Sequence, residues 1–246
     1  MKALILCAGK GERLLPLTAT IPKPMVQIAG KPLLSYNLQL CRKYGINEIA
    51  INTSHLPEKI KSFFKDGSEF GVNLHYSHEP ELLGTSGALN NFRDFFTEDF
   101  LVIYGDNLTD LNLESLISFH KEKKSLATLA LRRKPKEYET QSLIFADNDM
   151  RISKFIEKPS PEQVEAVSSE FKLINSGIYV LSNKILDYIP AGFSDFAYNI
   201  FPSLISANHP IHGFIMDSCY FREVGKMEKY KRARQEIESG EIKLNL

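Results

Sequence analysis

Short apolar runs alternate with segments of helical spacing along the first 130 residues of this 246-residue chain. The apolar runs are typical of strands buried on both faces, and they lie at residues 3–7, 49–51 and 101–104. The helical segments lie at residues 33–44, 56–64 and 113–120. This alternation predicts βαβ units, so we expect an α/β fold with a mostly parallel mixed sheet flanked by helices.

Parallel sheets bind their ligands in the loops at the carboxyl ends of the strands. The first and third predicted strands end at Cys7 and Tyr104. We therefore expect the residues that carry function in the loops that follow these two positions.

The pattern of apolar runs loosens after residue 131, where β-like pieces are separated by polar or proline-rich stretches. These pieces lie at residues 143–145, 152–156 and 172–181. We expect a single domain over 1–246, with a first lobe at 1–130, a smaller inserted lobe at 131–225 and a C-terminal helix in 226–246. The helix is indicated by an apolar stripe at three- and four-residue spacing, formed by Met227, Tyr230, Ala233 and Ile237.

Opposite charges balance in this chain, with 30 basic and 30 acidic side chains. A chain without an overall positive field is a poor ligand for nucleic acid or an anionic membrane surface, so we expect neither partner. The three cysteines show no C-x-x-C spacing, and no apolar stretch approaches the length of a membrane span. We expect a cytoplasmic protein without a secretory leader.

The loop after the first predicted strand contains Gly9 and Gly11, followed by Arg13. Glycines let main-chain N–H groups approach a phosphate closely, and a guanidinium can donate two hydrogen bonds to phosphate oxygens. The loop could thus hold a nucleoside triphosphate, although an ordinary strand-to-helix turn would use the same glycines for steric reasons. Two other phosphate-binding motifs are excluded. A dinucleotide fingerprint needs glycine or alanine at the position of Leu14, and a Walker A loop needs serine or threonine after its lysine, where Gly11 follows Lys10.

A lysine lies between two prolines a few residues further on, in the segment Pro22-Lys23-Pro24. Proline fixes its own φ angle and restricts the residue before it, so Lys23 is predicted to lie on a stiff segment. Its ammonium could face a second phosphate, or the segment could be a surface turn.

Six motifs follow one another along the chain. They are Gly9-x-Gly11-x-Arg13-Leu14-x-Pro16-Leu17-Thr18, Pro22-Lys23-Pro24-Met25, Leu83-Gly84-Thr85-Ser86-Gly87-Ala88, Gly105-Asp106, Phe155-Ile156-Glu157-Lys158-Pro159 and Asn175-Ser176-Gly177-Ile178-Tyr179. In this order they resemble the sugar-1-phosphate nucleotidylyltransferases, also called nucleotide-sugar pyrophosphorylases. The resemblance implies a Rossmann-like nucleotide lobe at 1–130, a sugar-binding lobe at 131–225, and nucleotidyl transfer from an NTP to a sugar 1-phosphate with release of pyrophosphate.

The resemblance also implies roles for individual residues. Arg13 and Lys23 are the catalytic candidates, since they can neutralise the phosphates of two anionic substrates. The implied nucleotide-binding residues are Leu6, Ala8, Gly9, Gly11, Glu81, Gly84 and Thr85. The implied sugar-phosphate-binding residues are Asp106, Asn107, Glu157, Lys158 and Asn175. The implied cofactor is Mg²⁺, with Asp106 and Glu223 as its ligands.

The departures from the family's pattern include two glutamates. Glu223 replaces the aspartate of the late Asp-x-Gly motif, and Glu12 occupies a position where threonine is common. The substitution at Glu223 leaves open a catalytically silent relative that serves as a regulatory or binding subunit. A dinucleotide-dependent oxidoreductase shares the alternation of strands and helices but does not accommodate Leu14.

The motifs point to more than one nucleotide and sugar. The segment 83–88 resembles that of guanylyl-transferring members, which implies GTP and mannose or heptose 1-phosphate as substrates. The Gly-Lys-Gly-Glu-Arg opening and the segment 65–71 instead favour uridylyl transfer to N-acetylmuramate 1-phosphate, and thymidylyl transfer is a further alternative. We also expect no appended acyltransferase-type β-helix after Leu246, and possible self-association into a homo-oligomer.

Overall fold

The computed structural model describes residues 1–135, 142–167 and 171–246, and these residues form two compact units. Unit 1 contains Met1–Leu82, Leu101–Asn112 and Cys219–Leu246. Unit 2 contains Leu83–Phe100 and Leu113–Ser218. Each unit therefore combines segments that are distant in the sequence.

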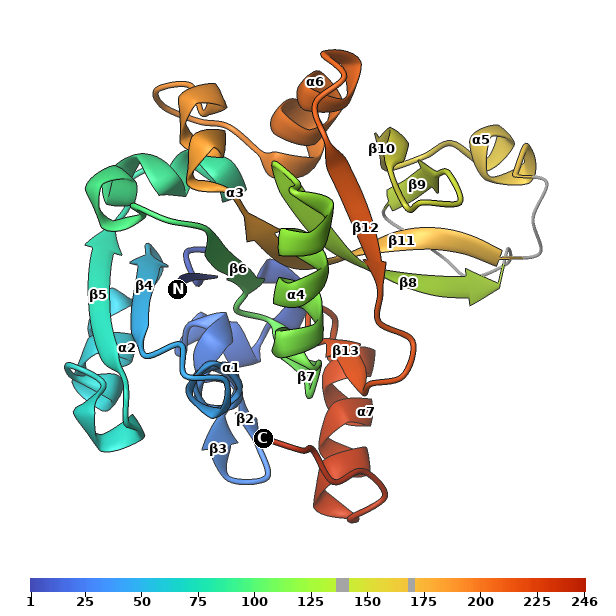
Figure 1. The fold of residues 1–246 in the computed structure, drawn as a ribbon. Helices are drawn as coiled ribbons and strands as arrows, with labels where there is room; N and C mark the ends of the chain where they lie inside the picture. Colours follow the sequence, from blue (N-terminus) through green and yellow to red (C-terminus); the bar gives the residue numbers. More distant parts are fainter. Residues whose placement is uncertain (136–141, 168–170) are drawn as a thin grey trace. The chain divides into compact units, whose positions relative to one another are not determined.

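The sheet of unit 1 has the strand order β6-β1-β4-β5 (Figure 1). These strands are β1 (Lys2–Leu6), β4 (Glu48–Thr53), β5 (Asn73–His78) and β6 (Phe100–Tyr104), the last entering unit 1 at Leu101. β4 pairs in parallel with both β1 and β5. The middle residues of β1 and nearly all of β4 and β6 are buried, as their continuous apolar runs predict.

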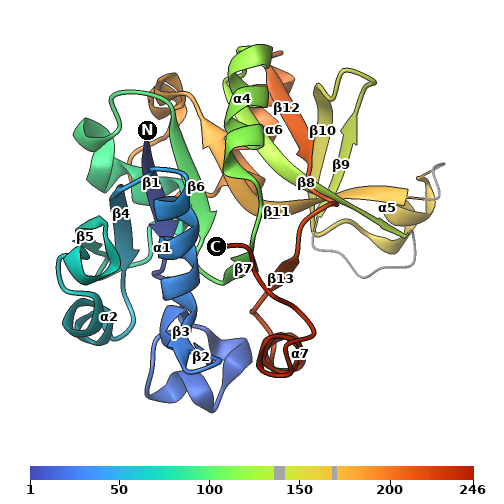
Figure 2. The same ribbon diagram turned by 60° about the horizontal axis from the view of Figure 1, so that its bottom comes forward.

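Helices in unit 1 begin and end where the sequence supplies the signals. α1 (Leu33–Lys43) is followed by Gly45 in the left-handed conformation, and α2 (Pro57–Phe64) has proline in its first turn. α7 (Met227–Glu238) is the predicted terminal helix, and it packs next to β13 (Figure 1, Figure 2). The short helices of unit 1 are η1 (Glu12–Leu14), η2 (Leu17–Ala19), η3 (Lys23–Met25) and η4 (Ser68–Phe70). Two pairs of short strands complete the unit. β2 (Gln27–Ile28) pairs with β3 (Lys31–Pro32), and β7 (Asn107–Thr109) pairs with β13 (Phe221–Glu223).

The strands of unit 2 are mostly antiparallel. They are β8 (Ala127–Pro135), β9 (Ser142–Ala146), β10 (Ile152–Glu157), β11 (Phe171–Leu181) and β12 (Ile211–Ile215). β11 pairs antiparallel with β8 and β9, β9 pairs antiparallel with β10, and β12 pairs in parallel with β8. α4 (Leu113–Lys123) packs on β8, β11 and β12. The other helices are α3 (Gly84–Gly87), η5 (Ala88–Phe95), α5 (Pro161–Glu165), η6 (Asn183–Tyr188), the π-helix η7 (Phe196–Ile200) and α6 (Phe201–Ser206).

The predicted α/β class with a mostly parallel sheet flanked by helices is confirmed. The apolar patterns missed β5, β8 and β12, whose sequences contain histidine or charged residues. The assignment of nucleotide binding to 1–130 and sugar binding to 131–225 stays a prediction, because the two compact units describe packing and not binding. Among the described residues, no helix combines the length and the apolar character that crossing a membrane requires.

Candidate functional site

The glycine-containing loop follows β1 in unit 1. Gly11 has a φ of 71°, and a Cβ atom there would lie 2.9 Å from Cγ2 of Thr18, so this position requires glycine. The hydroxyl of Thr18 donates to the carbonyl of Gly11 over 2.8 Å. Within the described part of the chain, the main-chain N–H groups of residues 8–11 have no hydrogen-bond acceptor. Unused main-chain donors of this kind are typical of anion-binding loops, and Gly9, at the exposed part of the loop, has open space beside it.

Lys23 and Asp106 form an ion pair between η3 and the residue that precedes β7. Their side chains are 14% and 15% exposed, so the pair is shielded from most of the solvent. Gly105 allows the chain before Asp106 to lie close to the end of β1, because a Cβ atom at this position would lie 2.8 Å from the carbonyl oxygen of Leu6. The N–H of Gly105 donates to that oxygen over 2.9 Å, which fixes Asp106 beside the end of β1.

Glu223 lies at the end of β13, opposite Asn107 of β7. Its carboxylate accepts a hydrogen bond from Nζ of Lys229 over 2.5 Å and lies 3.6 Å from Nη2 of Arg13. The N–H of Val224 donates to the carbonyl of Asp106 over 2.7 Å. The backbones of the two predicted metal ligands, Asp106 and Glu223, are thus joined, and the guanidinium of Arg13 faces the second of them.

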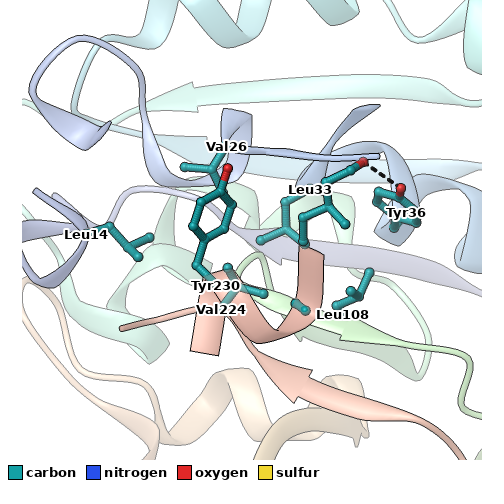
Figure 3. Close-up of a cluster of buried hydrophobic side chains, with 9 residues drawn as sticks. Leu14, Val26, Leu33, Tyr36, Leu108, Val224 and Tyr230 are labelled. Atoms are coloured by element: carbon teal, nitrogen blue, oxygen red, sulfur yellow. Dashed lines mark hydrogen bonds between the residues drawn. The ribbon is translucent and has the colours of Figure 1, made fainter. Parts of the chain in front are cut away.

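One hydrophobic cluster connects the segments that carry these charges (Figure 3). Leu14 directly follows Arg13, and Val224 directly follows Glu223. Val26 comes three residues after Lys23, and Leu108 comes two residues after Asp106. The cluster consists of Leu14, Val26, Ile28, Leu33, Tyr36, Leu108, Val224, Tyr230 and Ala233. Because these anchors are buried together, the charged side chains beside them are positioned by the core of unit 1.

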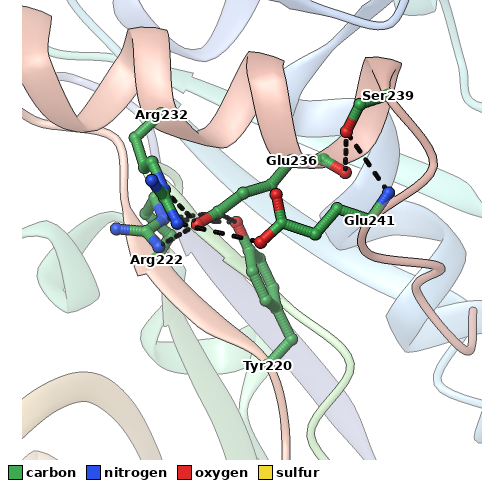
Figure 4. A network of polar contacts seen from close by, with 6 residues as sticks. All are labelled: Tyr220, Arg222, Arg232, Glu236, Ser239 and Glu241. Carbon is green, nitrogen blue, oxygen red and sulfur yellow. Dashed lines mark hydrogen bonds and ion pairs between the residues drawn. The ribbon is translucent and has the colours of Figure 1, made fainter.

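A polar network joins β13 to α7 (Figure 4). The buried carboxylate of Glu236 accepts hydrogen bonds from the hydroxyl of Tyr220 over 2.7 Å and from Nη2 of Arg222 over 2.6 Å. Nε of Arg232 donates to the same carboxylate over 2.6 Å. This network fixes α7, and hence Lys229, against the strand that ends at Glu223.

Sequence reasoning missed a buried chain of hydrogen bonds beneath the loop. The N–H of Cys7 donates to Oδ1 of Asn52 over 2.8 Å, and Nδ2 of Asn52 donates to Glu79 over 2.9 Å. Asn52 and Glu79 are each at most 2% exposed. An asparagine inside the buried strand β4 was the available signal, because a buried amide requires partners. Burial, and next the charge of Asp106, raise the pKa of the Cys7 thiol far above its ordinary value.

The donor set of unit 1 fits a magnesium ion that brings further ligands with its substrate. Mg²⁺ in proteins is commonly bound by one or two carboxylates together with phosphate oxygens, and Asp106 and Glu223 can supply the two carboxylates. No group of three or more His, Cys, Asp or Glu side chains within the described residues could hold a metal ion. Magnesium binding by this pair of carboxylates stays a prediction.

The other nucleotide candidates lie in both units. Leu6 and Ala8 flank the buried Cys7, and Glu81 is exposed after β5. In unit 2, Gly84 has a φ of 77°, and a Cβ atom there would lie 2.3 Å from the carbonyl oxygen of Ser194.

Thr85 is engaged in contacts within unit 2. Its hydroxyl donates to Asp195 over 2.8 Å and accepts from the N–H of Phe196 over 2.9 Å. Contacts with the segment 194–196 within unit 2 thus explain why glycine and threonine occupy positions 84 and 85. Their predicted role in base binding stays a prediction.

The sugar-phosphate candidates of unit 2 lie at the ends of β10 and within β11. Burial, and next the charge of Asp195, raise the pKa of Glu157 to about 7, while the charge of Lys158 opposes this shift. The exposed ammonium of Lys158 lies 5.7 Å from the ring centre of Tyr198. Asn175 donates from Nδ2 to the hydroxyl of Tyr179 over 2.7 Å, so its amide group is oriented within unit 2.

Comparison with known proteins identifies the family. The family described as nucleotidyl transferase matches residues 2–240. The chain is 39% identical to a UTP–glucose-1-phosphate uridylyltransferase of Synechocystis sp., covering 99% of this chain and 65% of that protein. It is 31% identical to a mannose-1-phosphate guanylyltransferase of Mycobacterium tuberculosis, covering 97% of this chain and 65% of that protein. The chain thus spans about two thirds of the length of these relatives, at 65% of each.

Solved structures agree with these matches. HddC from Yersinia pseudotuberculosis superimposes with a TM-score of 0.79 at 26% identity, covering 96% of this chain and 99% of HddC. The same protein has also been solved in complex with GMP-PN, again with a TM-score of 0.79. Because the family match extends over almost the whole sequence, this chain belongs to the nucleotidyl transferase family.

Proposed function

We propose that this chain transfers a nucleotidyl group from an NTP to a sugar 1-phosphate, giving an NDP-sugar and pyrophosphate. One observation carries the proposal. Arg13, Lys23, Asp106 and Glu223 lie in ion pairs within unit 1, and the loop that precedes Arg13 has main-chain N–H groups that find no acceptor among the residues the structure describes. Such a set of donors and charges suits a bound polyphosphate.

The reaction is an in-line attack of a sugar-phosphate oxygen on the α-phosphorus of the NTP. Because both substrates are anions, the main obstacle is the repulsion between their phosphates, and no protein nucleophile is needed. The N–H groups of residues 8–11 and Arg13 hold the triphosphate and the leaving pyrophosphate. Lys23 neutralises the α-phosphate and the attacking phosphate. Asp106 and Glu223 would hold Mg²⁺, and the bound ion would supply further neutralisation of the phosphate charge.

The remaining candidates bind the base and the sugar in this proposal. Leu6, Ala8, Gly84 and Thr85 bind the base, whose edge can be recognised by main-chain groups, and Glu81 is a further nucleotide-binding residue. Glu157 accepts hydrogen bonds from sugar hydroxyls, and Asn175 can both accept from them and donate to them. Asn107 and Lys158 bind the sugar phosphate.

GTP with mannose or heptose 1-phosphate is the first substrate pair to test. The motif at 83–88 favours it, and so do a relative named for mannose-1-phosphate guanylyl transfer and a structural neighbour solved with GMP-PN. A second pair, UTP with glucose 1-phosphate, is favoured by the relative with 39% identity.

The proposal also covers the cellular compartment, self-association and partners of the chain. The described cysteines are all free, which supports our proposal of a reducing compartment, the cytoplasm. Self-association into a homo-oligomer and the absence of nucleic-acid and membrane partners remain predictions.

Pyrophosphate release measures the proposed activity directly. The purified chain is assayed with Mg²⁺ and GTP, UTP or dTTP, each combined with mannose, glucose, heptose or N-acetylmuramate 1-phosphate. We expect release with at least one pair, and none when Mg²⁺ is removed by a chelator. Absence of release with every pair would contradict the proposal and favour a catalytically silent relative.

Variants of the two catalytic candidates test the same site. We expect Arg13→Ala and Lys23→Met each to lower kcat/KM by roughly 10²- to 10³-fold, the scale for losing one preorganised charge partner. Lys59→Met, at an exposed position of α2, serves as the matched loss of one positive charge and is expected to keep wild-type turnover. Undiminished turnover of Arg13→Ala would refute the role of the guanidinium.

A further inference from the structure

Lys229 of α7 has no role in the proposed function, yet it contacts one of the two carboxylates of the site. Its Nζ donates to Oε2 of Glu223 over 2.5 Å, while Nη2 of Arg13 lies 3.6 Å from Oε1 of the same side chain. Asp106, the other carboxylate, is paired with Lys23. Each predicted metal ligand is therefore already neutralised by a basic side chain of the protein.

The position of Lys229 is fixed by the packing of its helix. Glu236, two turns further along α7, is bound by Tyr220 and Arg222 of the segment that leads to Glu223. The hydroxyl of Tyr230, the next residue after Lys229, donates to the carbonyl of Gln27 over 3.0 Å. The ammonium is thus presented to Glu223 from an anchored helix, and the pair is only partly exposed, with side-chain exposures of 32% and 28%.

The backbone that follows Glu223 also contacts its carboxylate. A Cβ atom at Gly225 would lie 2.2 Å from Oε1 of Glu223, so the backbone of residue 225 lies directly against the carboxylate. Glu223 is therefore held between this backbone, Lys229 and Arg13.

A divalent cation that approaches without nucleotide meets carboxylates that are occupied by ammonium groups. Binding would require breaking the ion pairs and leaving the lysines beside a second positive charge, which is unfavourable. A triphosphate changes this balance, because its oxygens attract the same ammonium groups.

We propose that Lys229 is the counter-cation of Glu223 and makes metal binding by this chain depend on the nucleotide. This inference rests on the proposed function. Glu223 keeps its ion pair with Lys229 in the free protein. When the nucleotide is bound, the carboxylate becomes available to the metal and the ammonium of Lys229 becomes available to phosphate oxygens. Lys229 is thus a further polyphosphate-binding residue as well as a positioning residue for Glu223.

Binding of Mn²⁺ alone, measured by the electron paramagnetic resonance signal of the free ion, tests the proposal without turnover. We expect Lys229→Met to bind Mn²⁺ roughly tenfold more tightly than wild type in the absence of nucleotide, the factor that corresponds to about 1.4 kcal/mol for loss of one competing ion pair. Lys231→Met removes an exposed positive charge two residues away on the same helix and is expected to match wild type. Lys229→Arg is expected to retain weak Mn²⁺ binding.

Nucleotide gives the second readout. The gain in Mn²⁺ affinity on adding GTP or UTP, without sugar phosphate, is expected to be smaller in Lys229→Met than in wild type. Lys229→Gln keeps a hydrogen-bond donor for Glu223 without the charge, so it serves if the methionine variant does not fold and is also expected to bind Mn²⁺ more tightly. Folding of each variant is verified by its thermal unfolding.

The outcomes separate this inference from the proposed function. If wild type releases pyrophosphate while folded Lys229→Met and Lys229→Gln bind Mn²⁺ no more tightly than wild type, the counter-cation role is wrong and the proposed function stands. If wild type releases no pyrophosphate with any substrate pair, the proposed function fails, whatever the Mn²⁺ affinities are.

Discussion

Gly9 and Gly11 lie two residues apart in the same loop, but their backbones differ in what they tolerate. Gly11 adopts a φ of 71° and lies against Thr18 and Lys23, whereas Gly9 has no atom within 4 Å of a Cβ position. A left-handed conformation costs an L-residue about 1–2 kcal/mol, so only Gly11 is required by the fold.

Gly11→Ala is expected to lower the free energy of unfolding by about 1–2 kcal/mol, because alanine is strained at this φ and meets Thr18. Gly9→Ala, the matched control, is expected to leave it unchanged or raise it by up to about 1 kcal/mol through the unfolded chain. Urea denaturation measures both. Equal destabilisation by the two variants would contradict the assigned backbone roles.

Glu157 offers a second prediction, because its pKa of about 7 lies within the range of an ordinary assay. Burial and the neighbouring charge of Asp195 favour its protonated form, which cannot serve as fully as a hydroxyl acceptor. We expect the KM for the sugar 1-phosphate to rise as the pH falls from 8 to 6, with a transition near pH 7. The measurement is a steady-state titration of the sugar phosphate at each pH.

The substrate itself titrates in this range, since the second pKa of a phosphate monoester is about 6. Glu157→Gln controls for this, because it is expected to show only the titration of the substrate. A wild-type profile identical in shape to that of Glu157→Gln would refute a contact between Glu157 and the sugar.

At the scale of elements, the junction of β13 and α7 carries an unusual concentration of charge. Glu236 is 4% exposed and bound by Tyr220, Arg222 and Arg232, while Glu238, two residues away on the same helix, pairs with Arg234 in solvent. Removing one member of a buried ion pair leaves the charge of its partner buried without an opposite charge, which is strongly destabilising. An exposed ion pair contributes little to the free energy of unfolding.

We therefore expect Glu236→Ala to lower the free energy of unfolding by about 2–3 kcal/mol, less than for a fully buried pair because the two arginines are partly exposed. Glu238→Ala is expected to change it by at most about 0.5 kcal/mol. Guanidinium chloride denaturation of both variants measures the difference. A similar small effect of the two substitutions would show that the network does not hold α7 on β13.

At the scale of the whole molecule, we expect buried histidines to make the stability of unit 2 depend on pH. Unit 2 contains two buried histidines, His120 beside Thr128 and His212 beside Ser125, joined to these hydroxyls over 2.9 and 2.7 Å. Burial lowers the pKa of both imidazoles, and it outweighs the opposing charges of Asp99 at His120 and Asp149 at His212.

The sign of the pH effect follows from this lowering. In the unfolded chain the histidines take up protons below their ordinary pKa of about 6.5, while in the folded unit they stay neutral to lower pH. Their contribution to stability is therefore complete above pH 6.5 and is lost as the pH falls toward the folded pKa values.

Below pH 6.5, we expect the free energy of unfolding of unit 2 to decrease as the pH falls. Each of the two histidines contributes up to about 1.4 kcal/mol per pH unit to this decrease. Hydrogen exchange of the strands of unit 2 at pH 7.5, 6.5 and 5.5 measures this. The double variant His120→Gln/His212→Gln is expected to flatten the dependence. An unchanged slope in that variant would attribute the pH effect to other groups.

Much of the fold follows from local sequence. The continuous apolar runs of β1, β4 and β6 predict buried strands, because only a strand covered on both faces tolerates such runs. Strands such as β5, with four polar residues exposed or half-exposed, escaped prediction because their burial depends on what packs on them.

The sequence by itself determined the α/β class, the glycine loop and the candidate charges at Arg13, Lys23 and Asp106, because these follow from short-range patterns and ordered motifs. Only the tertiary structure decided which charges meet. Lys23 pairs with Asp106 across 83 positions of sequence, and Lys229 rather than a further carboxylate faces Glu223. Contacts of this kind depend on how separate elements pack around a common hydrophobic cluster, and no local period or spacing encodes that packing.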